Sequence, residues 1–436
     1  MRLRASEFVL MILHTALRLV QYGCQRLQCA HMTARGPVCP GGLACSRQPN
    51  SRQCVAGPVL ALLLLAVSPA SAAQMQPKAL LGGSAAGYAT VSAPRTFEFP
   101  ADHGSHDQFR SEWWYATGHL QTTAARIFGF QLTLFRFRLR PPQSSSAQVS
   151  PSAPELAPRS AWRSEHIWMG HMAVTDVATG KFYAFERFAR GGALGLAGAR
   201  SAPLRVWVED WHISANGAAA NWPWKLQARD GDVELSIELR SGRAPLAQGR
   251  NGYSQKSAGA DNASYYYSMT RMLGDGHIRI GEQSYRGAAT VWLDREWSSS
   301  ALGAQQLGWD WFGLHLADGR DLMLYRLRRV DGSVDRFSAA TVVNADGTVT
   351  KFSAEHFDAR PQGLVQMPSG RRYPLAWHLT IPDAAIDLHV STPVANQEHL
   401  GLLPYWEGSV ELRNARGEAA GRGYLEMTGY DSGAQP

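Results

Sequence analysis

The chain has 436 residues, which is long for one ordinary domain and suggests two. Its 45% hydrophobic and 18% charged residues are typical of a chain that buries cores, which excludes wholesale disorder. Residues 1–72 hold seven of the 43 basic residues and one of the 36 acidic ones, leaving 36 and 35, or +1, for the remainder. The overall charge of +7 therefore gives no support for a nucleic-acid partner.

Residues 1–72 are typical of a leader. An apolar run at 55–67 has the length of a signal-peptide core and is too short to span a bilayer comfortably. Ala70-Ser71-Ala72 follows it in the A-x-A pattern of a cleavage site. We expect cleavage near Ala72, a periplasmic or secreted product, and no transmembrane span in the mature chain. All five Cys lie in the leader, so disulfides and thiolate zinc sites are not expected after cleavage.

The rest of the chain has the pattern of an all-β protein. Residues 73–94 are rich in Ala, Gly and Ser and predict a flexible lead-in. Beyond them, short runs rich in aromatic and β-branched residues are separated by Gly, Asp and Asn turn signals. Expected strand segments include 126–139, 204–213, 232–239, 288–293, 321–330 and 341–352, the last with a hairpin turn at Asn344-Ala345-Asp346-Gly347. Many short strands predict sandwiches or barrels, which we divide into domains at 95–280 and 281–436.

Two sequence features refine this expectation. In the first of these strands, Phe130, Leu132 and Leu134 share one face, while Gln131 and Thr133 share the other. An internal duplication is also suggested. Trp114-Tyr115 and Trp311-Phe312 are each followed by His-Leu, a turn and a strand that carries aromatic or apolar residues alternating with Arg.

A first cluster of candidate site residues lies at 99–120. It contains the ionisable residues His103, His106 and Glu112 just ahead of the aromatic residues Trp113, Trp114 and Tyr115. A loop of this kind that enters an aromatic strand is typical of a ligand site at a barrel mouth. The alternative is a structural ion pair of Glu112 with Arg110 that plugs the end of a barrel.

A second cluster lies at 291–316. It combines the candidate catalytic acids Asp294, Glu296 and Asp310 with the candidate ligand-binding residues Trp292, Trp297, Trp309 and Trp311. In an extended strand Asp294 and Glu296 point the same way and Arg295 points the opposite way. Paired carboxylates can raise one pKa and leave a proton donor at neutral pH. The alternative is a buried ion network that joins the domains.

Tyr266 belongs to a third aromatic run, where it lines a ligand cavity or fills a core. No regular spacing of His, Asp and Glu defines a metal site, and the motifs of nucleotide cofactors are missing from the sequence. We therefore expect neither a metal nor a cofactor. The sequence also lacks the G-x-S-x-G motif of serine hydrolases.

Four ordered motifs resemble a known family. They are FPADHGSHDQFRSEWWYATGHL (99–120), YYYSMTRM (265–272), VWLDREWSSS (291–300) and GWDWFGLHL (308–316). They look like those of AttH, exported lipocalin-like proteins related to carotenoid 1,2-hydratases (hydroxyneurosporene synthases) and often labelled predicted secreted hydrolases. The resemblance covers about 96–431. It implies an all-β fold of two tandem lipocalin-like (calycin) antiparallel β-barrels.

The sequence and this resemblance leave three possible functions, of which we expect the first and keep the other two as alternatives. The first is binding of an apolar small molecule such as a lipid or an isoprenoid. The second is cofactor-independent hydration of a C=C bond, in which a carboxylic acid protonates the alkene and aromatic faces stabilise the carbocation. The third is a non-catalytic role as partner of an envelope ABC-transporter complex. The first two predict a cavity lined by the motif residues, and the third predicts that those residues pack solidly between the domains.

Overall fold

The computed structural model describes residues 85–142, 164–192, 194–215, 222–259, 262–298, 300 and 302–430. The predicted signal peptide, residues 73–84 of the lead-in and most of the Pro/Ser-rich stretch after residue 140 lie outside these ranges. In the part of the chain that is described, no helix is long and apolar enough to cross a membrane.

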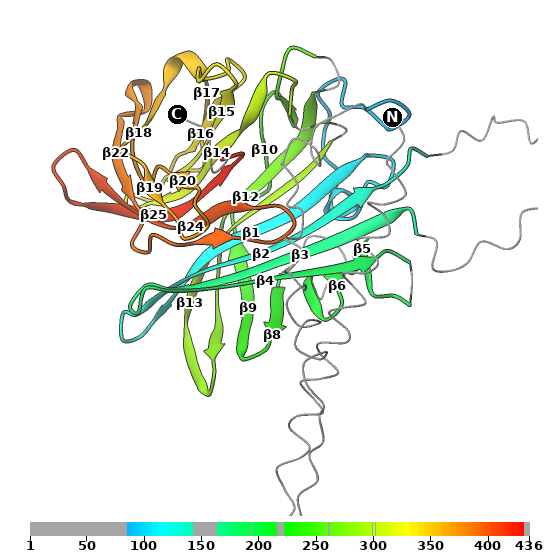
Figure 1. Cartoon of the computed structure of the whole chain (residues 1–436), viewed down its shortest axis with the longest axis horizontal. Helices are drawn as coiled ribbons and strands as arrows, with labels where there is room; N and C mark the ends of the chain where they lie inside the picture. Colours follow the sequence, from blue (N-terminus) through cyan, green and yellow to red (C-terminus); the bar gives the residue numbers. More distant parts are fainter. Residues whose placement is uncertain are drawn as a thin grey trace, which may run out of the picture. The chain divides into compact units, whose positions relative to one another are not determined.

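The first sheet has 13 strands and curls into a near-barrel (Figure 1, cyan to green). Its strands are β1 (Ser111–Thr122), β2 (Ile127–Arg138), β3 (His166–Asp176), β4 (Lys181–Arg190), β5 (Ala197–Ser201), β6 (Leu204–Val208), β7 (Trp211–Ala215), β8 (Trp224–Asp230), β9 (Val233–Gly242), β10 (Leu246–Ala247), β11 (Tyr253–Gln255), β12 (Ala263–Ile280) and β13 (Gln283–Ser298). The order is β4-β3-β2-β1-β13-β12-β9-β8-β7-β6-β5, and β10 and β11 pair with β12.

The second sheet has ten strands and forms a half-barrel (Figure 1, yellow to red). Its strands are β14 (Gln306–Leu316), β15 (Asp321–Arg329), β16 (Ala339–Val343), β17 (Val349–Ser353), β18 (Asp358–Pro361), β21 (Ala376–Ile381), β22 (Ile386–Ser391), β23 (Glu398–His399), β24 (Tyr405–Asn414) and β25 (Ala419–Thr428). The order is β17-β16-β15-β14-β25-β24-β22-β21-β18, and β23 pairs with β24. Strands β19 (Val365–Gln366) and β20 (Arg372–Tyr373) form a separate ribbon.

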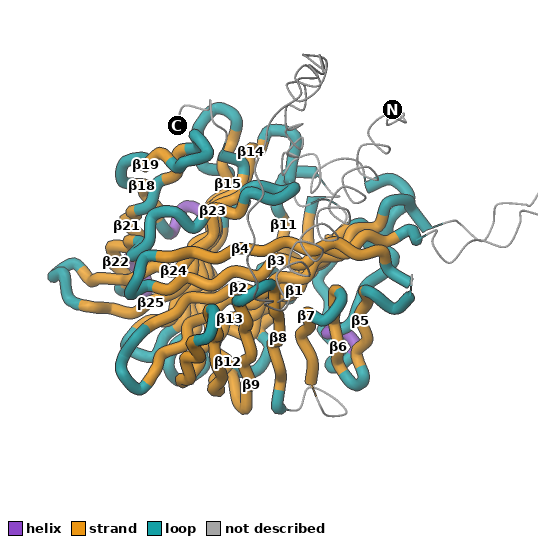
Figure 2. Tube along the Cα trace, turned by 60° about the horizontal axis from the view of Figure 1, so that its bottom comes forward, coloured by secondary structure: helices purple, strands orange, loops and turns teal. Residues whose placement is uncertain are grey.

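Strands dominate the described residues (Figure 2), which confirms the all-β, lipocalin-like prediction. The helices described are three short 3-10 turns, η2 (Ala101–His103), η3 (Ala354–His356) and η4 (Pro382–Ala384). Two of the expected segments are hairpins and not single strands: 204–213 is formed by β6 and β7, and 341–352 by β16 and β17. Glu209 takes a left-handed φ of 57° between β6 and β7, and this reverses the chain.

The passage from the first sheet to the second differs from the predicted boundary at 280. Strands β12 and β13 form one long hairpin on either side of that position, and β13 pairs with β1 as well. The change of sheet therefore falls between Ser298 and Gln306. Apolar strand ends and a Gly281 turn at φ 61° look like a domain boundary in sequence, but here they mark a hairpin.

Each sheet has its own core, and the two sheets share a third cluster between them. Phe130, Leu132 and Leu134 lie in the core of the first sheet, which confirms the predicted alternation. Gln131 on the opposite face is buried too, because the second sheet covers that face. Its amide nitrogen donates to the Tyr405 hydroxyl of β24 at 2.9 Å.

Candidate active site between the two sheets

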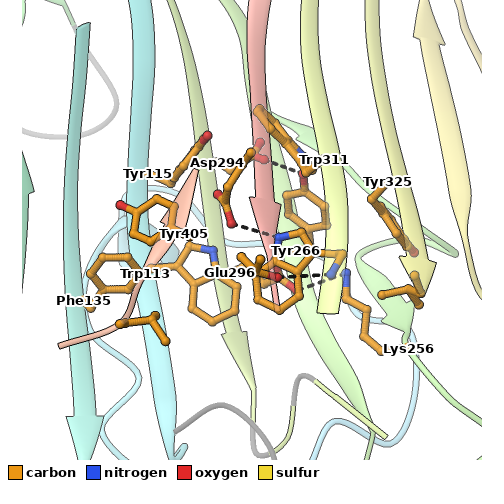
Figure 3. A pocket seen from close by; sticks show the side chains of 15 residues that line it. Trp113, Tyr115, Phe135, Lys256, Tyr266, Asp294, Glu296, Trp311, Tyr325 and Tyr405 are labelled. Carbon is orange, nitrogen blue, oxygen red and sulfur yellow. Dashed lines mark hydrogen bonds and ion pairs between the residues drawn. The ribbon is translucent and has the colours of Figure 1, made fainter. Parts of the chain in front are cut away.

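A cavity of about 80 Å³ lies between the outer faces of the two sheets. Strands β1, β2, β12 and β13 form one side, and β14, β15, β24 and β25 form the other. It is lined by Trp113, Tyr115, Phe135, Lys256, Tyr266, Asp294, Glu296, Trp309, Trp311, Tyr325, Leu327, Leu403, Tyr405, Glu426 and Thr428 (Figure 3). Aromatic rings thus surround a small group of ionisable side chains.

Asp294 is 4% exposed and is held by three donors. Ser268 Oγ and Trp292 Nε1 donate to Oδ1 at 2.6 and 2.7 Å, and the Tyr266 hydroxyl donates to Oδ2 at 2.5 Å. Burial raises the pKa of Asp294 to about 7 although these three hydrogen bonds act to lower it. Asp294 can therefore exchange a proton near neutral pH.

Glu296 faces the same cavity as Asp294, as strand alternation predicts. Lys256 Nζ lies 3.2 Å from Glu296 Oε1 and 4.3 Å from the centre of the Tyr325 ring. Burial would lower the pKa of Lys256, but the charge of Glu296 raises it above its ordinary value. Lys256 therefore stays a cation inside the cavity, and Glu296 is its ion-pair partner.

The second sheet supplies an acid of its own. Trp309 Nε1 donates to Glu426 Oε1 at 2.9 Å, and burial raises the pKa of Glu426 to about 8. Glu407 lies directly opposite Glu426 in the pairing of β24 with β25. Burial and the charge of Glu426 raise the pKa of Glu407 well above its usual range. The second sheet therefore keeps protonated carboxylic acids next to the cavity at neutral pH.

Asp294 and Glu426 occupy equivalent positions in the two sheets. The first strand of each sheet, β1 or β14, pairs with the next strand and with the last strand, β13 or β25. Tyr115 lies opposite Asp294 in the first pairing, and Trp311 lies opposite Glu426 in the second. The pairings thus support the suggested duplication, with Tyr115 equivalent to Trp311. The sequence comparison instead matched Trp114 with Trp311, so the two alignments differ by one residue.

Seven of the predicted site residues line the cavity: Trp113, Tyr115, Tyr266, Asp294, Glu296, Trp309 and Trp311. Trp292 lies behind Asp294 as its donor. Six predicted site residues are not among the lining residues: His103, His106, Glu112, Trp114, Trp297 and Asp310. They belong to three groups of side chains inside the two sheets.

Glu112 lies inside the first sheet in an ion cluster. Arg136 and Arg295 both donate to its carboxylate. His106 lies 3.5 Å from it and stacks on Trp297 at 3.7 Å. Burial would raise the pKa of Glu112, but the two guanidinium groups hold it well below its usual range. Glu112 therefore has the structural role that the sequence analysis gave as the alternative to ligand binding. Its ion-pair partners are Arg136 and Arg295, whereas the sequence analysis named Arg110.

His103 and Trp114 belong to the same interior. The Trp114 indole N–H donates to the His103 carbonyl at 2.8 Å, and the His103 ring shares a 2.7 Å hydrogen bond with the Tyr267 hydroxyl. Burial lowers the pKa of His103 to about 4, so its ring is neutral at pH 7. Both residues hold η2 against the barrel core.

Asp310 points into the second sheet, because its neighbours Trp309 and Trp311 face the cavity. Its carboxylate lies 3.2 Å from both Arg326 and Arg328, and it accepts a hydrogen bond from Tyr430 at 2.9 Å. Asp310 is thus part of a structural ion cluster, and the structure does not place it with Asp294 and Glu296.

Sequence reasoning missed Lys256, Glu426, Glu407 and Tyr405. Glu426 carried a usable signal, since it is an isolated acid in the apolar run 423–427, which lies within the last strand, β25. Lys256 carried none, because it lies outside the strands expected from the sequence, just after the short strand β11.

Among the described residues, one group has ligand atoms close enough for a metal ion. His378, Asp387 and His389 have such atoms within 4.8 Å of one another on the outer face of β21 and β22. None of them lines the cavity, whose described lining offers carboxylates and a lysine but no histidine.

Comparison with known proteins agrees with this two-sheet fold. A model of the AttH-like family matches residues 90–430. The crystal structure of NE1406 from Nitrosomonas europaea, described as an AttH protein, has a TM-score of 0.67 and 31% identity. That alignment covers 78% of this chain and 99% of the other. The chain therefore belongs to the AttH-like family.

Two more distant proteins are also similar. The structure of kievitone hydratase from Nectria haematococca has the same fold, with a TM-score of 0.57, 13% identity, and coverage of 81% of this chain and 99% of that one. The dehydratase asqC of Emericella nidulans is 24% identical over 187 residues, which is 41% of this chain and 51% of that protein. The chain thus matches about half the length of this curated relative.

Proposed function

We propose that the protein is a cofactor-independent hydro-lyase, which adds water to a C=C bond of a largely apolar substrate or removes it. The observation that carries the proposal is the presence of two buried acids with raised pKa values, Asp294 and Glu426, in one aromatic cavity. Two relatives named for hydration or dehydration, kievitone hydratase and asqC, support the same reaction class.

The two acids have unequal environments, and this separates their roles. Glu426 accepts a hydrogen bond from the Trp309 indole and has the higher pKa, so it is the proton donor to the alkene. Asp294 accepts hydrogen bonds from Tyr266, Ser268 and Trp292 and has the lower pKa, so its carboxylate accepts the proton of the attacking water. Electron-rich rings such as those of Trp309 and Trp311 stabilise the intermediate carbocation.

A turnover assay tests this proposal. A trisubstituted isoprenoid alkene is incubated with the protein in ¹⁸O-labelled water, and the product is analysed by mass spectrometry. A labelled tertiary alcohol that forms only with the protein is the expected result. Its absence over a panel of chain lengths, and the absence of the reverse dehydration, would contradict the proposal.

Carriage of an apolar ligand without chemistry is the second candidate, which the aromatic lining favours. In either case we expect an apolar ligand to quench tryptophan fluorescence, and to quench it less in Trp309→Phe and Trp311→Phe. Trp207→Phe is the control, because Trp207 lies on β6 and does not line the cavity. Equal quenching in all variants would count against binding at this site. Saturable quenching without ¹⁸O incorporation would favour carriage.

We also propose, on the sequence alone, that the protein is exported and cleaved near Ala72. N-terminal sequencing of exported material should find Ala73 or a near neighbour. An intact Met1 would overturn this prediction. A role beside an envelope transporter would then lose its basis as well.

A further inference from the structure

A groove of about 730 Å³ lies next to the cavity, between β11 of the first sheet and β15, β16 and β17 of the second. Tyr325 on β15 lines both spaces, so its side chain separates the groove from the cavity. Pockets for small ligands usually have volumes of about 300–1,000 Å³. The groove lies within this range, whereas the cavity of about 80 Å³ is far below it. The cavity therefore has room for only one end of a lipid-sized molecule.

Two arginines give the groove a positive surface. Arg250 and Arg336 line it, and both residues are exposed. The guanidinium group of Arg250 lies 5.7 Å from the centre of the Tyr253 ring. That of Arg336 lies 4.9 Å from the centre of the Phe337 ring. Neither arginine forms an ion pair with a carboxylate of the described residues, so both charges are available to a ligand.

A third cation of the groove lies on β17. Lys351 Nζ donates to the backbone carbonyls of Ala247 and Gly249 at 2.7 and 2.6 Å, and it has no carboxylate partner in the part of the chain that is described. Besides His356, the lining thus holds three cations and one carboxylate, that of Asp383. Tyr, Phe and Met side chains complete it. A groove with this lining is complementary to an anion attached to an apolar chain.

The wall between the two spaces is lightly held. The Tyr325 hydroxyl lies 3.3 Å from Ser254 Oγ, which is longer than the distance of about 2.7–2.8 Å that is usual between two oxygens. On the cavity side, Lys256 Nζ lies 4.3 Å from the centre of the Tyr325 ring (Figure 3). Movement of this one side chain would therefore connect the groove with the cavity.

We propose that the substrate is an amphipathic anion that spans both spaces. Its terminal alkene lies in the cavity, its apolar chain passes Tyr325, and its carboxylate or phosphate lies at the cations of the groove, Arg250, Arg336 and Lys351. This inference rests on the proposed hydration and names the class of its substrate. An uncharged molecule of the same length lacks the ionic contacts in the groove, so it should bind more weakly.

Equilibrium dialysis compares three ligands that share one terminal alkene: farnesoic acid, methyl farnesoate and farnesyl phosphate. We expect the wild type to bind the acid or the phosphate at least about 10-fold more tightly than the uncharged ester. The tighter of the two anions identifies the head group. The geranyl and geranylgeranyl homologues extend the comparison to shorter and longer chains.

Variants locate the two ends of the bound ligand. The double variant Arg250→Gln/Arg336→Gln should weaken binding of the anions about 10-fold and leave binding of the ester unchanged. Arg205→Gln is the matched control, because Arg205 also lies over an aromatic ring but lines neither space. Trp309→Phe and Trp311→Phe should lower fluorescence quenching by the same anion, since its other end reaches the cavity.

The outcomes separate the ligand from the reaction. Equal affinity for anions and ester at every chain length, or a double variant that keeps the preference, would overturn the groove assignment and leave the hydro-lyase proposal to the ¹⁸O assay. Quenching by the anions that does not depend on Trp309 and Trp311 would place them in the groove alone and overturn the spanning mode. Charge-dependent binding through both spaces without ¹⁸O incorporation would support the ligand class and contradict hydration.

Discussion

Asp294→Asn is expected to lower turnover by about 10²- to 10⁴-fold and to leave binding of an apolar ligand intact. The amide removes the proton acceptor for the attacking water but keeps the shape of the side chain. Its oxygen can still accept from Ser268 and Trp292, which now donate to Oδ1. Its nitrogen can donate to the Tyr266 oxygen when that hydroxyl rotates. The substitution therefore changes the chemistry of the site with little change in packing.

The control for this variant is Asp176→Asn. Asp176 is also buried, but it pairs with Arg126 at the far end of β3 and does not line the cavity. We expect Asp176→Asn to reduce stability and to keep turnover per folded molecule. Turnover is measured together with fluorescence quenching in the same samples. Full activity of Asp294→Asn would reject the assignment of Asp294.

The expected pH dependence of the rate follows from the pKa values of Asp294 and Glu426. Hydration needs Asp294 ionised and Glu426 protonated, so the rate should rise through the pKa of about 7 and fall through that of about 8. Because the two groups interact, these values belong to the pair. Any residual rate of Asp294→Asn should lack the acidic limb, and that of Glu426→Gln should lack the alkaline limb. A pH-independent rate from pH 5 to 9 would contradict the acid–base assignment.

The sequence predicted most of the first side of the cavity. Period-two alternation placed Asp294 and Glu296 together and Arg295 opposite, because a strand leaves side chains only two faces. It could not distinguish Asp310 from these acids. The strand β14 turns Trp309 and Trp311 toward the other sheet, and Asp310 therefore faces inward. Which face of a strand meets a partner sheet is a long-range property that local patterning does not contain.

The second side of the cavity depended on pairings between distant segments. Glu426 lines the same cavity as Asp294 only because β25 pairs with β14 as β13 pairs with β1. His171 and Tyr405 are separated by 234 positions and meet through the contact of the two sheets. Burial then raises the pKa values of Asp294 and Glu426. Each of these carboxyl groups is buried because the two sheets are in contact. The residue types were visible in the sequence, while their convergence was not.

The largest expected effect on stability belongs to Glu112→Ala, which should lower the free energy of unfolding by about 3–5 kcal/mol. The substitution leaves Arg136 and Arg295 with no carboxylate between them, and both guanidinium groups are fully buried. Glu112→Gln keeps the shape and should lose most of the same free energy. Glu165→Ala is the control, because the Arg138–Glu165 pair is partly exposed and such pairs contribute about 1 kcal/mol or less.

Urea unfolding at several pH values separates the charge of Glu112 from its packing. The folded protein holds the pKa of Glu112 below its unfolded value, so the unfolded chain binds the extra proton as the pH falls. The stabilisation is therefore complete above the unfolded pKa of about 4 and is lost progressively below it. We expect the difference between wild type and Glu112→Gln to shrink over that acidic range. A difference that stays constant with pH would contradict the assignment of this stabilisation to the charge of Glu112.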